Sequence, residues 1–173
     1  DCNMPSGESF VRQALLGRRY FQEKFNARPT TAINFDPFGH SSGLPQVLAK
    51  CGYDSYLICR PSKTECPTED ETFVWQGLDG SRVTVERAYG GYLSLRGQAR
   101  GKVEGHLKEN GGLDTLAVLW GIGNHGGGPS REDLKMLGEL MSEREDATIV
   151  HSTPEAYFKE LKDRGVKLPI HTE

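Results

Sequence analysis

The residue best placed to do chemistry in this sequence is Asp36, in the segment Phe35-Asp36-Pro37-Phe38-Gly39-His40-Ser41. It follows an apolar run, residues 31–35, that reads as a buried strand, and a helix begins soon after His40. A carboxylate at the end of a strand, beside a turn built from Pro and Gly, lies where α/β folds keep their catalytic groups. The same residue types also suit an ordinary turn. Asp36 alone therefore leaves both interpretations open.

Two glycine-containing loops are further candidates. Tyr89 and Tyr92 flank a pair of glycines, a composition that suits close approach to a ligand or ordinary loop packing. Residues 121–130 form a longer loop that lacks the Gly-Lys-Ser/Thr of a phosphate-binding loop. The next helix starts with Glu132 and Asp133, which would repel a phosphate at its N-terminus. We therefore expect this loop to pass near something uncharged and bulky rather than a nucleotide.

Helices and single apolar strands alternate around these candidates. The sequence predicts helices from Ser6 to about residue 26 and at about 43–51, 97–109 and 130–144, and another helix that begins near Pro154. Strands are predicted at 31–35, 55–59, 115–120 and 147–151, with a hairpin of 72–76 and 82–86 around an Asp-Gly turn. No clear element is predicted after residue 166. This order predicts an α/β fold with a mostly parallel sheet, or an open, irregular barrel, covered by helices.

The composition limits the class of protein. The 173 residues suit one domain or a large piece of one, with 36% hydrophobic and 26% charged residues. A formal charge of −3 without a basic patch argues against a nucleic-acid partner. No apolar stretch is long enough to span a membrane, and no signal peptide is visible, although a start at Asp1 leaves a removed segment possible. The four cysteines have no metal-site spacing, which favours reduced thiols and a cytoplasmic location.

Several segments together resemble glycoside hydrolase family 38, the retaining α-mannosidases, and the opening residues 1–9 resemble its bacterial branch. The matching segments occur in order along nearly the whole chain: Phe35-Asp36-Pro37-Phe38-Gly39-His40-Ser41 with Leu44-Pro45, the strand that ends at Arg60, Phe73-Val74-Trp75-Gln76-Gly77-Leu78-Asp79-Gly80-Ser81, and the loop from Gly123 to Pro129. The resemblance implies an irregular, (β/α)7-type barrel and a mannose-containing oligosaccharide as substrate. It also implies a parent protein that forms a homodimer.

The resemblance assigns roles to residues around the first motif. Asp36 takes the place of the catalytic nucleophile, which is also a ligand of a divalent metal, usually zinc. Retaining hydrolysis needs such a carboxylate, with an acid about 5–5.5 Å away. Arg60 corresponds to the arginine that steadies the nucleophile and contacts substrate, and a solvated strand-end charge is its alternative. His40 would serve as a supporting or packing residue, or as a direct metal ligand.

The acid/base is where this sequence departs from the family pattern. Many relatives carry an aspartate in the glycine-rich loop, and the corresponding residues here are Asn124 and His125. Asn124 has no titratable proton and would bind substrate, whereas His125 could act as the acid or as a binding group, or have no catalytic duty. Tyr89 and Tyr92 fall where family members keep aromatic sugar contacts.

The family's remaining metal ligands, a His-x-Asp pair and a later histidine, lie outside this chain. Because zinc normally takes about four ligands, the resemblance implies that residues 1–173 are an internal, central portion of the catalytic domain, inactive in isolation. Two other functions stay open. A metal-dependent polysaccharide deacetylase would need a downstream His-x-x-x-His pair, which is absent from the sequence. A non-catalytic sugar-binding remnant would lack the His-x-Asp strand.

Overall fold

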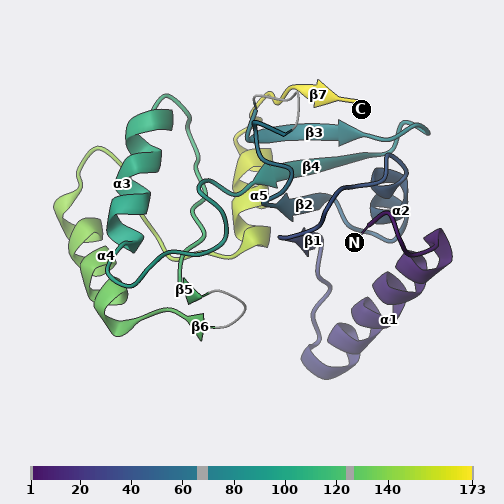
Figure 1. Ribbon diagram of the computed structural model, residues 1–173, viewed down its shortest axis with the longest axis horizontal. Coiled ribbons are helices and arrows are strands. Elements are labelled where there is room, and N and C mark those ends of the chain that lie inside the picture. Colours follow the sequence, from purple (N-terminus) through teal and green to yellow (C-terminus); the bar gives the residue numbers. More distant parts are fainter. Residues whose placement is uncertain (1, 66–69, 124–126, 173) are drawn as a thin grey trace. The chain divides into compact units, whose positions relative to one another are not determined.

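The computed structural model describes residues 2–65, 70–123 and 127–172 (Figure 1). The chain divides into two compact units, one formed by Asp1–Arg87 with Pro154–Glu173 and the other by Ala88–Thr153. Each unit is built around its own core. No described helix combines the length and apolar character needed to cross a membrane.

A five-stranded sheet forms the centre of the first unit. Its strands are β1 (Thr31–Asn34), β2 (Ser55–Ile58), β3 (Thr72–Gln76), β4 (Arg82–Arg87) and β7 (Ile170–His171), in the order β1-β2-β4-β3-β7. Only β3 and β4, the predicted hairpin, pair antiparallel; the other three pairs are parallel. The predicted α/β class and the mostly parallel sheet are confirmed. The described strands form an open sheet and no closed barrel.

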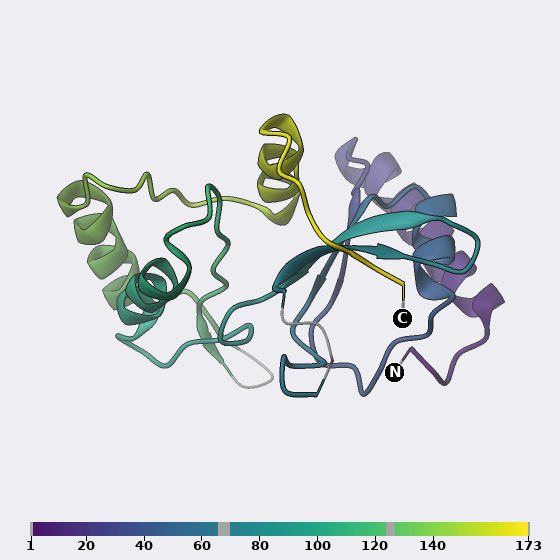
Figure 2. The same cartoon turned by 90° about the horizontal axis from the view of Figure 1, so that it is seen from above.

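Helices cover the two faces of this sheet, as Figure 2 shows from above. On one face, Leu44 and Leu48 of α2 (Leu44–Lys50) pack with alternate strand residues, which include Tyr56, Trp75 and Val85. On the other face lies α5 (Pro154–Asp163), whose Tyr157 reaches the strand β4. Buried strands covered on both faces account for the continuous burial of β2.

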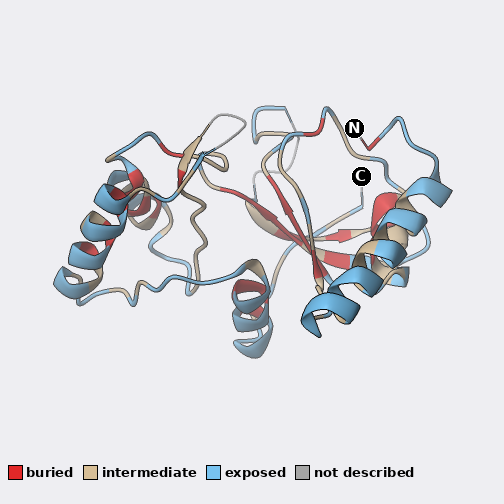
Figure 3. Cartoon of the chain, turned by 90° about the horizontal axis from the view of Figure 1, so that it is seen from below, coloured by how far each residue is buried: buried red, intermediate tan, exposed pale blue. Residues whose placement is uncertain are grey.

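Helix α1 (Gly7–Phe25) begins as predicted, with the Ser6 side chain accepting a hydrogen bond from the Ser9 amide, yet it has no buried residue. Figure 3 shows it exposed along most of its length. It is held to the end of α2 by Arg18, which donates to the Gly52 carbonyl and lies over the Tyr53 ring. Its predicted apolar face is therefore only partly used in this structure.

The second unit is built on α3 (Ala99–Asn110) and α4 (Arg131–Glu143). Their core comprises Ala99, Val103, Leu137 and Leu140. Ser130 caps α4 as predicted. A short antiparallel pair, β5 (Ile122–Gly123) and β6 (Gly127–Gly128), brackets the glycine-rich loop.

Two predicted strands are wrong. Residues 115–120 and 147–151 belong to no strand in the described chain. Val118, Trp120 and Ile149 pack instead against the α3–α4 core, so hydrophobic contact accounts for their apolar character without a ladder of backbone hydrogen bonds. Conversely, residues 170–171 form β7, where no element was predicted, because two residues carry too little pattern to indicate a strand.

Candidate active site

Asp36 and Arg60 meet beyond the carboxyl ends of two neighbouring strands. Strands β1 and β2 pair parallel with Asn34 opposite Ile58, so the residues that follow each strand leave the sheet side by side. The Nε atom of Arg60 lies 2.5 Å from Oδ1 of Asp36, and 51% and 42% of the two side chains are exposed. The pair is thus fixed in direction yet open to a ligand, and it confirms the predicted proximity of these two residues.

His40 lies beside this pair and uses both of its ring nitrogens. Nε2 is 2.7 Å from the carbonyl oxygen of Arg60, and Nδ1 is 3.0 Å from the hydroxyl of Tyr56. Burial lowers the pKa of His40, although the hydrogen bond to the Arg60 carbonyl acts in the opposite direction. The imidazole is therefore neutral near pH 7. Because a carbonyl can only accept, Nε2 carries the proton and Nδ1 accepts from the Tyr56 hydroxyl.

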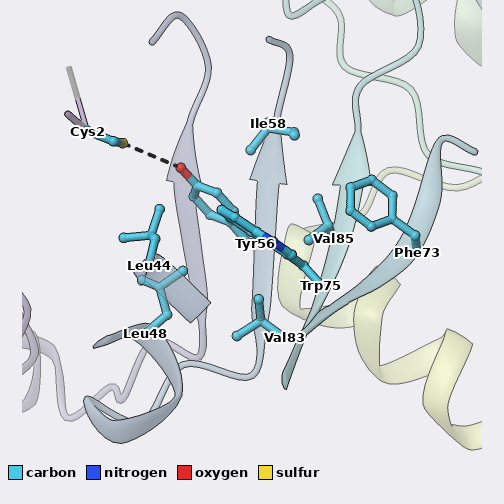
Figure 4. Packing of buried hydrophobic residues seen from close by; sticks show 9 residues of the cluster. All are labelled: Cys2, Leu44, Leu48, Tyr56, Ile58, Phe73, Trp75, Val83 and Val85. Atoms are coloured by element: carbon cyan, nitrogen blue, oxygen red, sulfur yellow. Dashed lines mark hydrogen bonds between the residues drawn. The ribbon is translucent and has the colours of Figure 1, made fainter. Parts of the chain in front are cut away.

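The tyrosine that orients His40 is itself held in the sheet core. Tyr56 stacks on Trp75 of β3 with ring centroids 6.4 Å apart, and its hydroxyl faces the Cys2 thiol at 4.0 Å (Figure 4). Burial raises the pKa of the Tyr56 phenol well above its ordinary value, so the group stays a hydrogen-bond donor. Asn34, at the end of β1, donates to the Cys2 sulfur at 2.9 Å. The N-terminal segment is thereby attached to the strand ends that carry the pair.

One glycine in the motif is required by its backbone. Gly39 has a φ of +143°, and a Cβ there would lie 2.7 Å from the side-chain nitrogen of Asn3. This conformation lets the loop turn from Asp36 towards His40.

The remaining predicted site residues belong to the second unit or lie outside the description. Tyr89 stacks on His106 of α3 with ring centroids 4.1 Å apart, so one of its faces is already covered. Tyr92 is half-buried in the loop that leads towards α3. Asn124 and His125 lie outside the described residues. Their roles stay predictions from the sequence.

A metal centre is not complete within the described residues. None of them form a group of three or more His, Cys, Asp or Glu side chains able to hold a metal ion. Asp36 supplies one carboxylate, with Arg60 against one of its oxygens, and His40 has both nitrogens engaged. These residues alone do not fit a zinc site, which takes about four ligands.

Sequence reasoning missed Tyr56, Trp75 and Cys2 as parts of the site. The sequence pattern predicts each of them to be an ordinary core residue. Strand alternation and hydrophobicity indicate burial, but they do not indicate which polar atom a side chain contacts. The signal that could have found Tyr56 is its hydroxyl, since a buried Tyr oxygen requires a partner.

The whole chain, residues 1–173, matches the family model described as "Glycosyl hydrolases family 38 N-terminal domain". It is 32% identical over 171 residues to alpha-mannosidase G of Dictyostelium discoideum and, over the same length, to alpha-mannosidase 2C1 of Homo sapiens. Each alignment covers 97% of this chain but only 16% of the relative.

A solved structure agrees in fold. The crystal structure of an alpha-mannosidase from Enterococcus faecalis V583 superposes with a TM-score of 0.70 at 16% identity, covering 95% of this chain and 20% of that one. The chain thus spans about a fifth or less of the proteins it resembles. It belongs to glycosyl hydrolase family 38, as part of the N-terminal domain.

Proposed function

We propose that the full-length protein containing this chain is a retaining α-mannosidase that removes terminal α-linked mannose from oligosaccharides, with Asp36 as its nucleophile. The relatives named alpha-mannosidase support the substrate class, and the family match favours a glycosidase over a deacetylase. The observation that carries the role of Asp36 is its pairing with Arg60 at adjacent strand ends, half-exposed to a ligand. A carboxylate that attacks the anomeric carbon from one side reacts faster when a partner such as Arg60 holds it in the orientation for attack.

The reaction takes place in two steps. An oxygen of Asp36 attacks the anomeric carbon while the bond to the leaving oxygen breaks and that oxygen takes a proton from an acid, for which we propose His125. Water then attacks the mannosyl–Asp36 ester, and the same group removes its proton. Two inversions leave the product in the α-configuration. Arg60, Asn124, Tyr89 and Tyr92 are proposed contacts to the sugar.

A divalent metal, zinc by preference, belongs to the same proposal. Asp36 would be one ligand, and residues outside this chain would supply the others. The described residues do not build a metal site by themselves. A cytoplasmic, homodimeric parent protein of bacterial type remains a prediction from the sequence.

The nucleophile can be tested in the full-length protein with an aryl α-mannoside. We expect Asp36→Ala to reduce kcat on the order of 10³-fold or more, because the covalent step is lost. Added azide should restore turnover of Asp36→Ala and give the β-mannosyl azide, since a single displacement inverts the anomeric carbon. Proton NMR of the wild-type reaction should show α-mannose as the first product.

A matched control is available in Asp146, which forms an exposed pair with Arg144 at the same Nε–Oδ1 distance of 2.5 Å. Asp146→Ala should keep wild-type kinetics. Undiminished turnover by Asp36→Ala would refute the assignment of Asp36 as the nucleophile. A wild-type protein that binds mannosides without hydrolysing them would instead identify a sugar-binding remnant.

A further inference from the structure

We propose that His40 is a positioning residue: by holding the backbone carbonyl of Arg60, it determines where the Arg60 guanidinium meets Asp36. This inference rests on the proposed function of Asp36. It assigns a role to His40, which has none in the proposed two-step reaction. His40 does not touch the reacting atoms in this proposal. It acts through Arg60.

The need for such a contact follows from the length of strand β2. Its ladder pairs with β1 and β4 both end at Ile58, two residues before Arg60. Arg60 lies beyond these ladder pairs, and Pro61, which follows it, has no N–H to donate. The hydrogen bond from His40 Nε2 to the Arg60 carbonyl, at 2.7 Å, provides a fixed point at this residue.

His40 can act as a fixed point because the sheet core holds its ring. The Tyr56 hydroxyl lies 3.0 Å from Nδ1, and the imidazole stands edge-on to both Tyr56 and Trp75, with centroids 5.5 and 6.0 Å away. Tyr56 and Trp75 belong to β2 and β3 and stack on each other. A series of contacts therefore runs from the core through the imidazole to the Arg60 backbone.

The same contacts argue against His40 as a metal ligand. A neutral imidazole binds a metal through its unprotonated nitrogen, which here accepts from Tyr56. The other nitrogen donates to a backbone carbonyl. Ligation through Nδ1 would break its hydrogen bond with Tyr56 and leave the hydroxyl of this buried residue to find another acceptor.

The kinetic test compares three substitutions in the full-length protein. His40→Leu and His40→Asn, which cannot reach the Arg60 carbonyl, should lower kcat/KM about 10- to 100-fold, mainly through kcat. His40→Gln places an amide donor near the position of Nε2 and should recover most of this loss. His40→Asn keeps a polar side chain, so it also serves if His40→Leu does not fold. His171→Leu, a histidine paired with Asp70, is the matched control and should leave the kinetics unchanged.

Coupling to Arg60 separates positioning from a general structural role. If His40 acts through Arg60, adding His40→Asn to Arg60→Ala should reduce kcat/KM by less than about threefold, because the group to be positioned is already gone. A full, additive loss in the double variant would overturn the proposal, as would wild-type kcat/KM in both His40→Leu and His40→Asn.

A crystal structure of full-length His40→Asn decides the question without relying on activity. The proposal expects Arg60 Nε to move out of hydrogen-bonding distance of Asp36. An unchanged contact would overturn the proposal even if the protein hydrolyses mannosides. Conversely, if the wild-type protein does not hydrolyse mannosides, the proposed function is refuted. The structure of His40→Asn would still test whether His40 positions Arg60.

Discussion

Two carboxylates near the strand ends lie in opposite environments. Asp36 is half-exposed against a guanidinium, whereas Glu86 is 2% exposed on β4. The hydroxyls of Thr72 and Tyr157 donate to one oxygen of Glu86 at 2.6 and 2.8 Å and thereby connect the hairpin to α5. Burial raises the pKa of Glu86 to about 7; the two hydroxyls and Arg87 act against this shift, and Glu71 adds to it.

The raised pKa predicts a pH-dependent stability. The ordinary pKa of a glutamate is 4.5, so the stability that the buried Glu86 contributes is complete below that pH and is lost as pH rises through its raised pKa of about 7. We expect about 3 kcal/mol less stability at pH 8 than at pH 4.5 from this group. At pH 8 Glu86→Gln should be more stable than the wild type, and it should lose the corresponding slope of stability against pH, measured by urea unfolding of the chain from pH 4.5 to 8.

An exposed glutamate provides the control for this measurement. Glu160 pairs with Arg164 one helical turn away, and Glu160→Gln should change stability by less than about 0.5 kcal/mol without altering the slope. An unaltered slope in Glu86→Gln would show that another group causes the pH dependence.

At the scale of elements, the start of α4 joins the two helices of the second unit. The Ser130 side chain accepts from the Asp133 amide at 2.9 Å, and the fully buried Asp133 carboxylate accepts from the Ala99 amide at 3.1 Å. One cap therefore fixes both α4 and the first residue of α3. Arg96 and Glu132 add an exposed ion pair beside it.

This arrangement predicts an order of stability losses in urea unfolding. Ser130→Ala removes an N-cap and should cost about 1 kcal/mol. Asp133→Ala should cost more, about 1–3 kcal/mol, because it leaves the buried Ala99 amide without its acceptor. Glu132→Ala, in the same helical turn, should cost less than about 0.5 kcal/mol. Equal losses in the first two variants would contradict a bridging role for Asp133.

At the scale of the whole molecule, the chain spans 16% of the length of two relatives whose alignments cover 97% of it. Its described residues hold one member of the proposed metal site and no group able to bind a metal ion alone. Under the proposed function, residues 1–173 would contribute the Asp36–Arg60 pair to the active site, and segments outside this chain would supply the other metal ligands.

Accordingly, the isolated 173-residue chain should neither retain zinc nor hydrolyse an aryl α-mannoside. Calorimetric titration is expected to detect no zinc site tighter than about 1 μM, whereas the full-length protein should hold zinc after gel filtration and lose activity with a chelator. Stoichiometric zinc in the isolated chain would place further ligands within it.

The elements that local signals define were predicted well. Ser6 and Ser130 start helices because their side chains satisfy free backbone amides, and the Asp79-Gly80 pair closes the hairpin because Gly80 adopts a φ of +82°. The strands β1 and β2 were also predicted, but two other apolar runs were misassigned. The runs at 115–120 and 147–151 are apolar enough for strands, but the α3–α4 core uses them as loops.

The sequence by itself determined that Asp36 follows a strand within a turn, because strand pattern, Pro and Gly act over a few neighbouring residues. It also placed Arg60 after the next strand. Only the tertiary structure decided that these side chains meet, that His40 reaches the Arg60 carbonyl, and that Glu86 is buried against Tyr157, 71 residues away. Those contacts depend on strand register and on which side chains fill the core, and both are set by the packing of the whole sheet.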